Sequence, residues 1–369
     1  GLAYTDPDFK FPQVWRTNIA LDQKLPYGIV GTFEYMYSKD VNGVKYINAN
    51  LKDPTSAFTG ADTRDRWLGG NAGNRIQSNV SGAFVLKNQD VGSNWNYAVS
   101  LEKPFSNGFY AKAGYSYGQA KNLFDPGSVA AGSWQGNPIV GDPNNPELSR
   151  ASNSPGHRFF TAFSVRKDYL GVGATTIAVF INGQTQGYAS YVYNGDMNGE
   201  GAFNNDLMYI PANTSEMVFE QYTSGGRTYT AAQQAAAFEA YIKQDPYLST
   251  RRGQYAERNG LKLPMLWRAD LSVTQDLFTT VRGKLNNLQV RVDMLNFTNF
   301  LNNNWGASRR LEAPNGRPLS TAGVDGNGAA RFRMNAVTTG GDLVAKTFNT
   351  NAGVGDVWRF QLGLRYTFN

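Results

Sequence analysis

The sequence predicts an all-β fold, a transmembrane antiparallel β-barrel region of about nine strands. Three observations predict this class. Apolar and polar residues alternate with a period of two along many segments. Short turns and long connections alternate along the chain. The 369 residues are rich in aromatic side chains, at 13%, and in Gly, at 40 residues, while charged residues make up only 17%.

The alternation is clearest in residues 356–369, DVWRFQLGLRYTFN. Successive side chains of a strand point to opposite faces, so every second residue from Trp358 to Phe368 lies on one apolar face. Arg359 and Arg365 lie on the other face. The same pattern predicts strands near residues 15–21, 29–37, 95–101, 109–117, 159–165, 177–181, 265–277 and 288–294.

The connections between these strands differ in length. The sequence predicts short turns at 24–28, 103–108, 167–171 and 278–286, and long loops at about 40–93, 121–156, 187–263 and 299–355. Short turns on one side and long loops on the other are typical of outer-membrane barrels, in which the long loops are extracellular. A soluble β-sandwich rarely has such unequal loops.

The strand count predicts that more barrel lies upstream of Gly1. Bacterial barrels have an even number of strands, so nine strands do not close by themselves. The alternative is an extra hairpin inside the first long loop, formed by residues 44–49 and 79–86. The strand-end aromatics Trp15, Tyr27, Tyr115 and Tyr117 are candidates for an interfacial girdle, although core aromatics would also explain them.

Composition argues against several classes of function. The net charge is +6 and the 35 Lys and Arg residues are scattered, so we expect no nucleic-acid partner. Cys is absent, which excludes disulfides, Cys-ligated zinc and Cys nucleophiles. The single histidine, His157, argues against a His metal cluster or a His-based triad. No phosphate-binding loop, dinucleotide fingerprint or nucleophile elbow is present, so we expect no enzyme and no required cofactor.

One loop resembles a calcium-binding sequence. Asp196, Asn198 and Glu200 have the one-three-five spacing of such loops, Gly201 supplies the sharp turn, and Asp206 stands one place short of the usual last acid. These hard oxygen ligands suit Ca²⁺ on an extracellular face. The alternative is a plain polar turn, because Gly, Asn and Asp are common in turns.

A single short loop helix is predicted at residues 230–244, with Thr230 as its cap and Asp245 and Pro246 at its end. The helix either stabilises its loop or belongs to a lid that closes over a substrate. The charged residues that follow it either order the loop through ion pairs or bind an anionic or peptide ligand; we favour ordering. They are Arg251, Arg252, Glu257 and Arg258.

Several segments of the sequence resemble a known family. The terminal QLGLRYTFN, with Tyr366 and Phe368, resembles the signal read by the outer-membrane assembly machinery. Residues 153–160 (NSPGHRFF), 204–211 (NNDLMYIP), 251–260 (RRGQYAERNG), 263–277 (LPMLWRADLSVTQDL), 290–302 (VRVDMLNFTNFLN) and 305–306 (WG) occur in the order found in Oar-like TonB-dependent outer-membrane receptors. The resemblance covers nearly the whole chain.

The resemblance implies that residues 1–369 are the C-terminal part of a barrel of about 22 strands. It implies an N-terminal barrel portion, a plug absent from this chain, and a TonB-type energy coupler as partners, besides the lipid bilayer and possible surface lipoprotein subunits. Charges on the polar strand faces would then contact the plug or line a permeation path. They are Arg268, Asp270, Asp276, Arg291, Asp293, Arg359 and Arg365.

The implied function is active import or export of a bulky substrate, with a peptide or polypeptide as the family-level expectation. Two alternatives remain open at the level of sequence. One is a self-contained passive porin or a surface adhesin barrel. The other is a soluble extracellular β-protein such as a carbohydrate-binding module.

Overall fold

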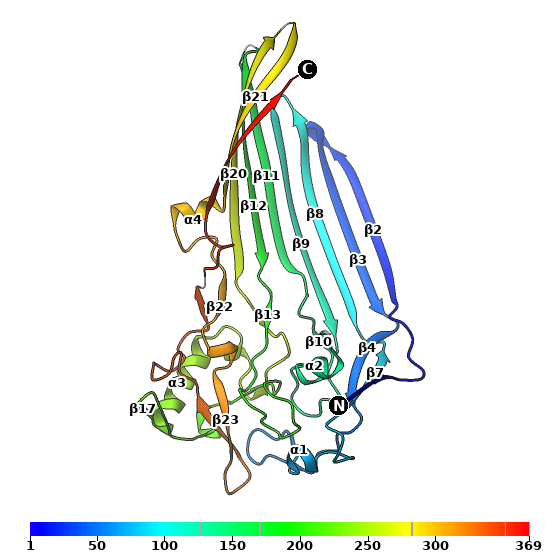
Figure 1. Cartoon of the computed structure of the whole chain (residues 1–369), viewed down its shortest axis with the longest axis vertical. Helices are drawn as coiled ribbons and strands as arrows, with labels where there is room; N and C mark the ends of the chain where they lie inside the picture. Colours follow the sequence, from blue (N-terminus) through cyan, green and yellow to red (C-terminus); the bar gives the residue numbers. More distant parts are fainter. Residues whose placement is uncertain (126, 128, 170, 282, 351, 369) are drawn as a thin grey trace.

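A computed structural model describes residues 1–125, 127, 129–169, 171–281, 283–350 and 352–368. Within these residues, nine long strands form one antiparallel sheet in which each strand pairs with the next (Figure 1). The strands are β2 (Val14–Leu25), β3 (Ile29–Asp40), β8 (Ser93–Ser106), β9 (Phe109–Asn122), β11 (Gly156–Tyr169), β12 (Gly173–Thr185), β20 (Met265–Val281), β21 (Lys284–Leu295) and β26 (Arg359–Thr367). The prediction of an all-β, mostly antiparallel fold is confirmed.

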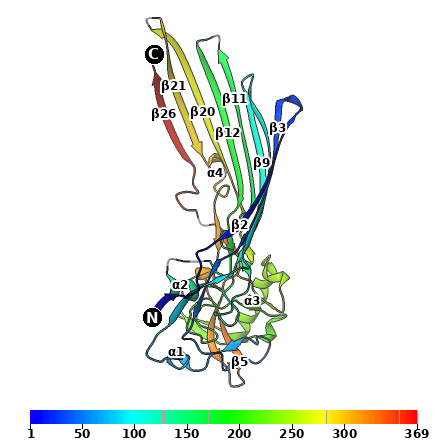
Figure 2. The same ribbon diagram turned by 90° about the vertical axis from the view of Figure 1, so that its right-hand side faces the viewer.

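The sheet is open, because β2 and β26 are its two edges and do not pair with each other in the described residues (Figure 2). The short strand β10 (Ser149–Arg150) pairs with the end of β9, so β2 and β26 remain the two edge strands. Unpaired backbone groups are costly in a bilayer. Each edge therefore needs a further strand beside it if the sheet is to span a membrane.

Two of the predicted short turns are tighter than expected. Strand β8 continues to Ser106, so only Asn107 and Gly108 form the turn, with φ of 52° and 79°. Two positive φ values fit the type I′ turn that matches strand twist. The turn predicted at 278–286 is also narrower, since β20 and β21 pair as far as Val281 and Lys284. Backbone pairing continues beyond Leu277 and Leu288, where the regular alternation of apolar and polar residues ends, so the apolar pattern does not show it.

Two of the turn predictions each include one residue that lies outside the described residues. These positions are Leu170, in the turn predicted at 167–171, and Arg282, in the turn predicted at 278–286. The turn after β2 is the 3-10 helix η1 (Pro26–Gly28), where Tyr27 has a φ of 62°.

Strand register places apolar residues opposite one another across the whole sheet. Phe33 on β3 faces Leu21 on β2 and Val99 on β8. At the other edge, Val290 on β21 faces Leu364 on β26. Leu364 is 73% exposed, and the other apolar residues of β26 are also exposed. A continuous exposed apolar face is what a lipid-facing surface requires.

The long connections gather mainly at one end of the sheet, opposite the short turns (Figures 1 and 2). They run through residues 41–92, 123–155, 186–264 and 296–358, and we call them together the loop body. The main hydrophobic core lies here, around helix α3 (Ala231–Gln244). Phe238, Tyr241 and Ile242 of α3 are fully buried.

Helix α3 matches the predicted loop helix, and Thr230 and Gln233 form a reciprocal cap at its start. The expectation of a single helix is wrong. The described residues also contain α1 (Gly70–Gly73), α2 (Ala130–Gln135) and α4 (Phe297–Leu301). With 4, 6 and 5 residues, these helices are too short to show a helical period in the sequence. None of the described helices is long and apolar enough to cross a membrane.

The hairpin suggested inside the first long loop forms, but it does not join the main sheet. Strand β7 (Ala83–Gln89) pairs with β4 (Gly43–Asn48) and, in parallel, with β1 (Leu2–Thr5). The nine-strand order is therefore unchanged.

Further short strands and 3-10 helices crosslink the loop body. The strand pairs are β5 (Ser56–Ala57) with β6 (Asp65–Arg66), β13 (Tyr188–Ala189) with β19 (Leu261–Lys262), β14 (Tyr209–Ile210) with β18 (Gln254–Tyr255), β16 (Tyr222–Ser224) with β17 (Arg227–Tyr229), β22 (Arg309–Leu311) with β25 (Phe348–Thr350), and β24 (Ala330–Met334) with both β15 (Val218–Phe219) and β23 (Leu319–Val324). The 3-10 helices are η2 (Thr214–Glu216), η3 (Leu248–Thr250) and η4 (Pro314–Gly316).

Candidate functional site

Three acids of the predicted calcium loop lie together in the loop body. Asp196, Glu200 and Asp206 each place a carboxylate oxygen within 4.8 Å of the others. Glu200 is 4% exposed and Asp206 is fully buried, while Asp196 is partly exposed. The structure therefore forms an acidic cluster from residues spread over an eleven-residue segment, 196–206.

Backbone hydrogen bonds fold this segment around its own acids. The two carboxylate oxygens of Asp196 accept from the N–H groups of Gly199, at 2.7 Å, and Gly201, at 2.9 Å. Asp206 Oδ2 accepts from the N–H of Met197 at 2.8 Å. Gly199 and Gly201 have φ of 85° and 93°, a conformation that favours Gly. The glycines thus let the chain turn back sharply enough to bring the acids together.

Asn198 is buried and mainly holds the loop in place. Its Oδ1 accepts from the N–H of Glu200 at 3.2 Å, and its Nδ2 donates to the carbonyl of Gly141 at 3.4 Å. Sequence reasoning missed Asn205, which is fully buried and donates to Glu200 Oε1 at 2.8 Å. Its position directly before Asp206 was the available signal.

Arg64 also borders the cluster, and no local sequence pattern pointed to it. It is 4% exposed and forms hydrogen bonds of 3.1 Å to both carboxylate oxygens of Asp62. It also donates to the Leu207 carbonyl at 2.7 Å. Its Nη1 lies 3.5 Å from Asp206 Oδ1 without a hydrogen bond. Asp62 is thus the main partner of Arg64.

Burial perturbs the two inner acids. Burial has the largest effect on the pKa of Asp206 and raises it to about 7. Arg64 and the Met197 N–H lower this pKa, but their effects are smaller. Burial, followed by repulsion from Asp206 and Asp196, raises the pKa of Glu200 well above its usual range. Both shifts show that this buried site disfavours the charged form of the Glu200 and Asp206 carboxylates.

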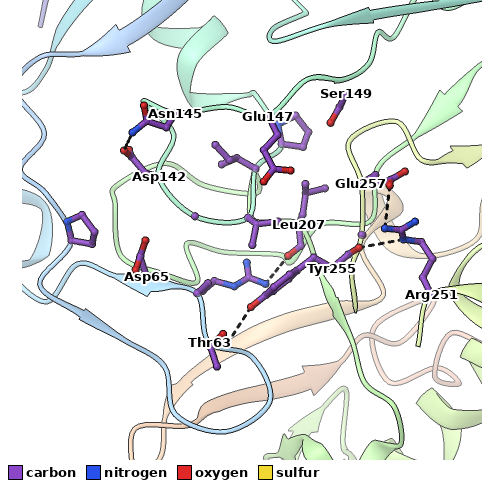
Figure 3. Close-up of a pocket in the computed structure, with 17 residues that line it drawn as sticks. Thr63, Asp65, Asp142, Asn145, Glu147, Ser149, Leu207, Arg251, Tyr255 and Glu257 are labelled. Atoms are coloured by element: carbon purple, nitrogen blue, oxygen red, sulfur yellow. Dashed lines mark hydrogen bonds and ion pairs between the residues drawn. The ribbon is translucent and has the colours of Figure 1, made fainter. Parts of the chain in front are cut away.

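The loop body also contains a pocket of about 760 Å³, whose lining residues are drawn in Figure 3. Arg64 and Leu207 belong to its lining and connect it to the acids described above. The pocket carries more acidic than basic side chains, and its volume is in the range of small-ligand sites. The charged lining residues are Arg64, Asp65, Asp142, Glu147, Arg251 and Glu257.

The basic residues after α3 form the ion pairs expected of a loop-ordering role. Arg252 Nη2 lies 2.7 Å from a carboxylate oxygen of Glu239 on α3. Arg258 is 2% exposed and pairs with Asp125 at 3.4 Å. Arg251 pairs with Glu257 at 3.1 Å, and both also line the pocket. Arg251 is therefore the basic residue of this group that is placed to meet a ligand.

The polar-face charges of β20, β21 and β26 divide into two groups. Five of them have partners within the chain. Arg268 contacts Asp356, and Asp270 accepts a hydrogen bond from the Asn296 N–H at 2.7 Å. Arg291 and Asp293 pair with each other at 2.8 Å, and Asp276 pairs with Arg166 at 2.9 Å. Arg359 and Arg365 are exposed, and no ion pair joins them to the described residues. A role in plug contact or permeation remains a prediction, for which these two arginines are the best placed.

Aromatic side chains gather at the end of the sheet that adjoins the loop body. The ring centroids of Tyr115 and Phe159 are 4.5 Å apart, as are those of Tyr117 and His157. His157 Nδ1 also lies 2.9 Å from the Tyr115 hydroxyl. His157 thus belongs to an aromatic band across β9 and β11, as a girdle requires.

The other girdle candidates and the terminal signal are exposed. Trp15 is 68% exposed, and Tyr27 lies in the turn at the far end of the sheet with 89% exposure. Tyr366 and Phe368 are 56% and 74% exposed, with ring centroids 6.1 Å apart. The final residue, Asn369, lies outside the described residues.

Comparison with known proteins agrees with this architecture. The sequence model of one family, described as Outer membrane beta barrel domain, matches residues 1–324. No curated protein and no solved structure matches the chain. The match covers most of the chain and indicates a bacterial outer-membrane location and a transporter or porin-like role. The chain therefore belongs to the outer membrane β-barrel domain family.

Proposed function

We propose that this chain is the C-terminal barrel region of a TonB-dependent active transporter that takes up a bulky substrate, with a peptide as the preferred class. The observation that carries the proposal is the loop body, which has its own hydrophobic core and a pocket of about 760 Å³ at one end of the sheet. An ordered structure of this kind is suited to capture a ligand before transport. No enzymatic step is part of this function.

The open sheet supports the presence of further barrel strands. Both edges, β2 and β26, lack a neighbour among the described residues. In the proposed transporter, an N-terminal barrel portion pairs with these edges and a plug fills the interior. A TonB-type coupler acts on the plug, and the long loops face the cell exterior, where surface lipoproteins could cover them.

The pocket lining favours a basic substrate segment. Arg64 forms an ion pair with Asp62, and Arg251 forms one with Glu257. Asp65, Asp142 and Glu147 remain as acidic groups around the cavity. The excess of carboxylates attracts Lys or Arg side chains over acidic ones.

Uptake by cells tests energised transport. The full-length protein is placed in the outer membrane of hosts with and without the TonB-type coupler, and uptake of a fluorescent lysine-rich peptide is measured with and without a protonophore. We expect uptake to require both the coupler and the proton gradient. Equal uptake under all conditions would identify a passive porin. Surface binding without uptake would identify an adhesin.

Conductance in planar bilayers tests the proposed plug contact. We expect the full-length protein to be closed, because the plug occupies the interior. The double variant Arg359→Glu, Arg365→Glu reverses charge on the polar face and should produce a leak. Lys243→Glu is the control, because this side chain is 70% exposed on α3 in the loop body. Steady conductance of the unmodified protein would contradict the plugged arrangement.

A further inference from the structure

Three buried oxygen atoms in the acidic cluster accept no hydrogen bond within the part of the chain that the structure describes. Glu200 Oε2, Asp206 Oδ1 and Asn205 Oδ1 are buried and accept no hydrogen bond from the described residues. All three side chains are at least nine-tenths buried. A buried polar atom without a hydrogen bond is unfavourable, and more so when it is charged. Three such atoms in one short segment indicate that a group outside the chain completes the site.

The charge balance points to a cation. Arg64 is matched by Asp62, with which it shares two hydrogen bonds. Arg64 Nη1 also lies 3.5 Å from Asp206 Oδ1, so this one guanidinium is shared between Asp62 and Asp206, and no ion pair joins Asp196 or Glu200 to the described residues. Uncompensated buried charge is strongly unfavourable, and a divalent ion removes most of it.

The geometry fits one oxygen-ligated ion. Calcium binds oxygen at about 2.3–2.6 Å, so two of its ligands on opposite sides lie about 5 Å apart. The carboxylate oxygens of the cluster lie within 4.8 Å of one another, which one ion can contact together. The donors are carboxylates and an amide, with no thiol or imidazole among them. This donor set suits calcium, whereas magnesium usually keeps several waters and binds through one or two carboxylates.

We propose that a Ca²⁺ ion binds Asp196, Glu200 and Asp206, with Asn205 as a fourth oxygen donor, and fastens three long connections of the loop body together.

The hydrogen bonds around the cluster explain this fastening role. The Asn198 carbonyl accepts from the Trp67 N–H at 2.8 Å, which ties the loop to residues 41–92. The Asn205 carbonyl accepts from the Ile139 N–H at 2.8 Å, which ties it to residues 123–155. Ile139 and the next residue after the cluster, Leu207, both line the pocket. Binding of the ion therefore orders one wall of the pocket.

Calcium binding to the purified full-length protein in detergent tests the site directly. After treatment with EGTA, isothermal titration with CaCl₂ should show one binding event with a Kd at or below about 1 mM. MgCl₂ at the same concentration should give at least about tenfold weaker binding. Glu200→Gln and Asp206→Asn keep the side-chain shape and should each weaken calcium binding at least about tenfold. Asp342→Asn, at an exposed loop acid, should bind like the unmodified protein.

Thermal unfolding separates loss of the ion from failure to fold. In EGTA, Glu200→Gln should be at least as stable as the unmodified protein, because it removes a repelling charge. Addition of calcium should raise the Tm of the unmodified protein and leave that of the variant unchanged. An unmodified protein that binds no calcium, or variants that bind it with unchanged affinity, would overturn the proposal.

Discussion

The guanidinium of Arg258 lies 3.4 Å from the carboxylate of Asp125, and the pair joins two long connections of the loop body. Arg258 also donates to Asn122 Oδ1 at 2.7 Å and to Asn137 Oδ1 at 3.3 Å. Only 2% of Arg258 is exposed, and its buried contacts hold residues 123–155 against residues 186–264.

Replacement of Arg258 should therefore destabilise the loop body. Arg258→Met removes the cation beside Asp125 and the donor to the side-chain oxygens of Asn122 and Asn137, which costs about 3 kcal/mol. Hydrogen exchange of the full-length protein should show lost protection in residues 123–155 and 254–261, with the long strands unchanged. Arg252→Met, which removes a half-buried pair with Glu239, is the control and should cost about 1 kcal/mol or less. Equal protection in both variants would contradict the fastening role.

Acidic pH should loosen the same contact. Burial alone would raise the pKa of Asp125, but hydrogen bonds from the Ser152 N–H and Asn122, together with Arg258, hold it below its usual value. Because the pKa of Asp125 is lower in the folded protein than in the unfolded chain, its ionised form stabilises the folded state. This stabilisation is fully present above the pKa of the unfolded chain, about 3.9, and is lost as the pH falls through the pKa of the folded protein.

Hydrogen exchange of the backbone amides, measured at pH 5 and at pH 3, tests this pH dependence. The unmodified protein should lose loop-body protection over this range. Asp125→Asn should be less protected at pH 5, and its difference from the unmodified protein should shrink at pH 3. A difference that stays constant with pH would show that the Asp125 carboxylate does not contribute through its charge.

A second network lies on the polar face of the sheet. Asp276 on β20 is 3% exposed and accepts from Arg166 at 2.9 Å, Asn287 at 3.0 Å and Gln289 at 2.9 Å. Arg166 belongs to β11, so its side chain reaches across β12.

Asp276→Ala should lower the free energy of unfolding by about 2–3 kcal/mol, because three donors lose their acceptor. Urea unfolding of the refolded protein in detergent measures the change. Arg365→Gln, on the same face but without an ion pair to the described residues, should change stability by less than about 0.5 kcal/mol. Similar losses in both variants would indicate a general effect of polar-face charge.

The terminal aromatics should matter for assembly. Phe368 is exposed beside Tyr366 on the apolar face at the end of β26. Phe368→Ala should lower the amount of protein in the outer-membrane fraction several-fold, as measured by immunoblot. Thr367→Ala, on the opposite face of the strand, should leave that amount unchanged. Equal amounts of both variants would show that Phe368 is not part of the assembly signal.

Much of the sheet was predictable from the sequence. A strand near Val14 and the alternation through Phe368 follow from the period of two, which is a local property of extended backbone. The extent of the hairpin around Val281 was not predictable, because its polar residues pair through the backbone without an apolar pattern. Helices as short as α1 leave no periodic signal.

The acidic cluster was partly predictable. Asp196, Glu200 and Asp206 were identified from their spacing in one loop, and glycine positions allow that loop to fold back on itself. Asn205 was within reach of the same reasoning. Arg64 was not, because its approach to Asp206 depends on how two distant connections pack.

By itself, the sequence determined the strand class, the strand order and which face of each strand is apolar, because these depend on neighbours along the chain and on short turns. Only the tertiary structure decided that Arg258 meets Asp125, that Arg166 crosses to Asp276, and that Arg64 and Leu207 join the acidic cluster to a pocket. These contacts unite segments far apart in the chain. They form only when the long connections close and pack against a common core, which local periodicity does not encode.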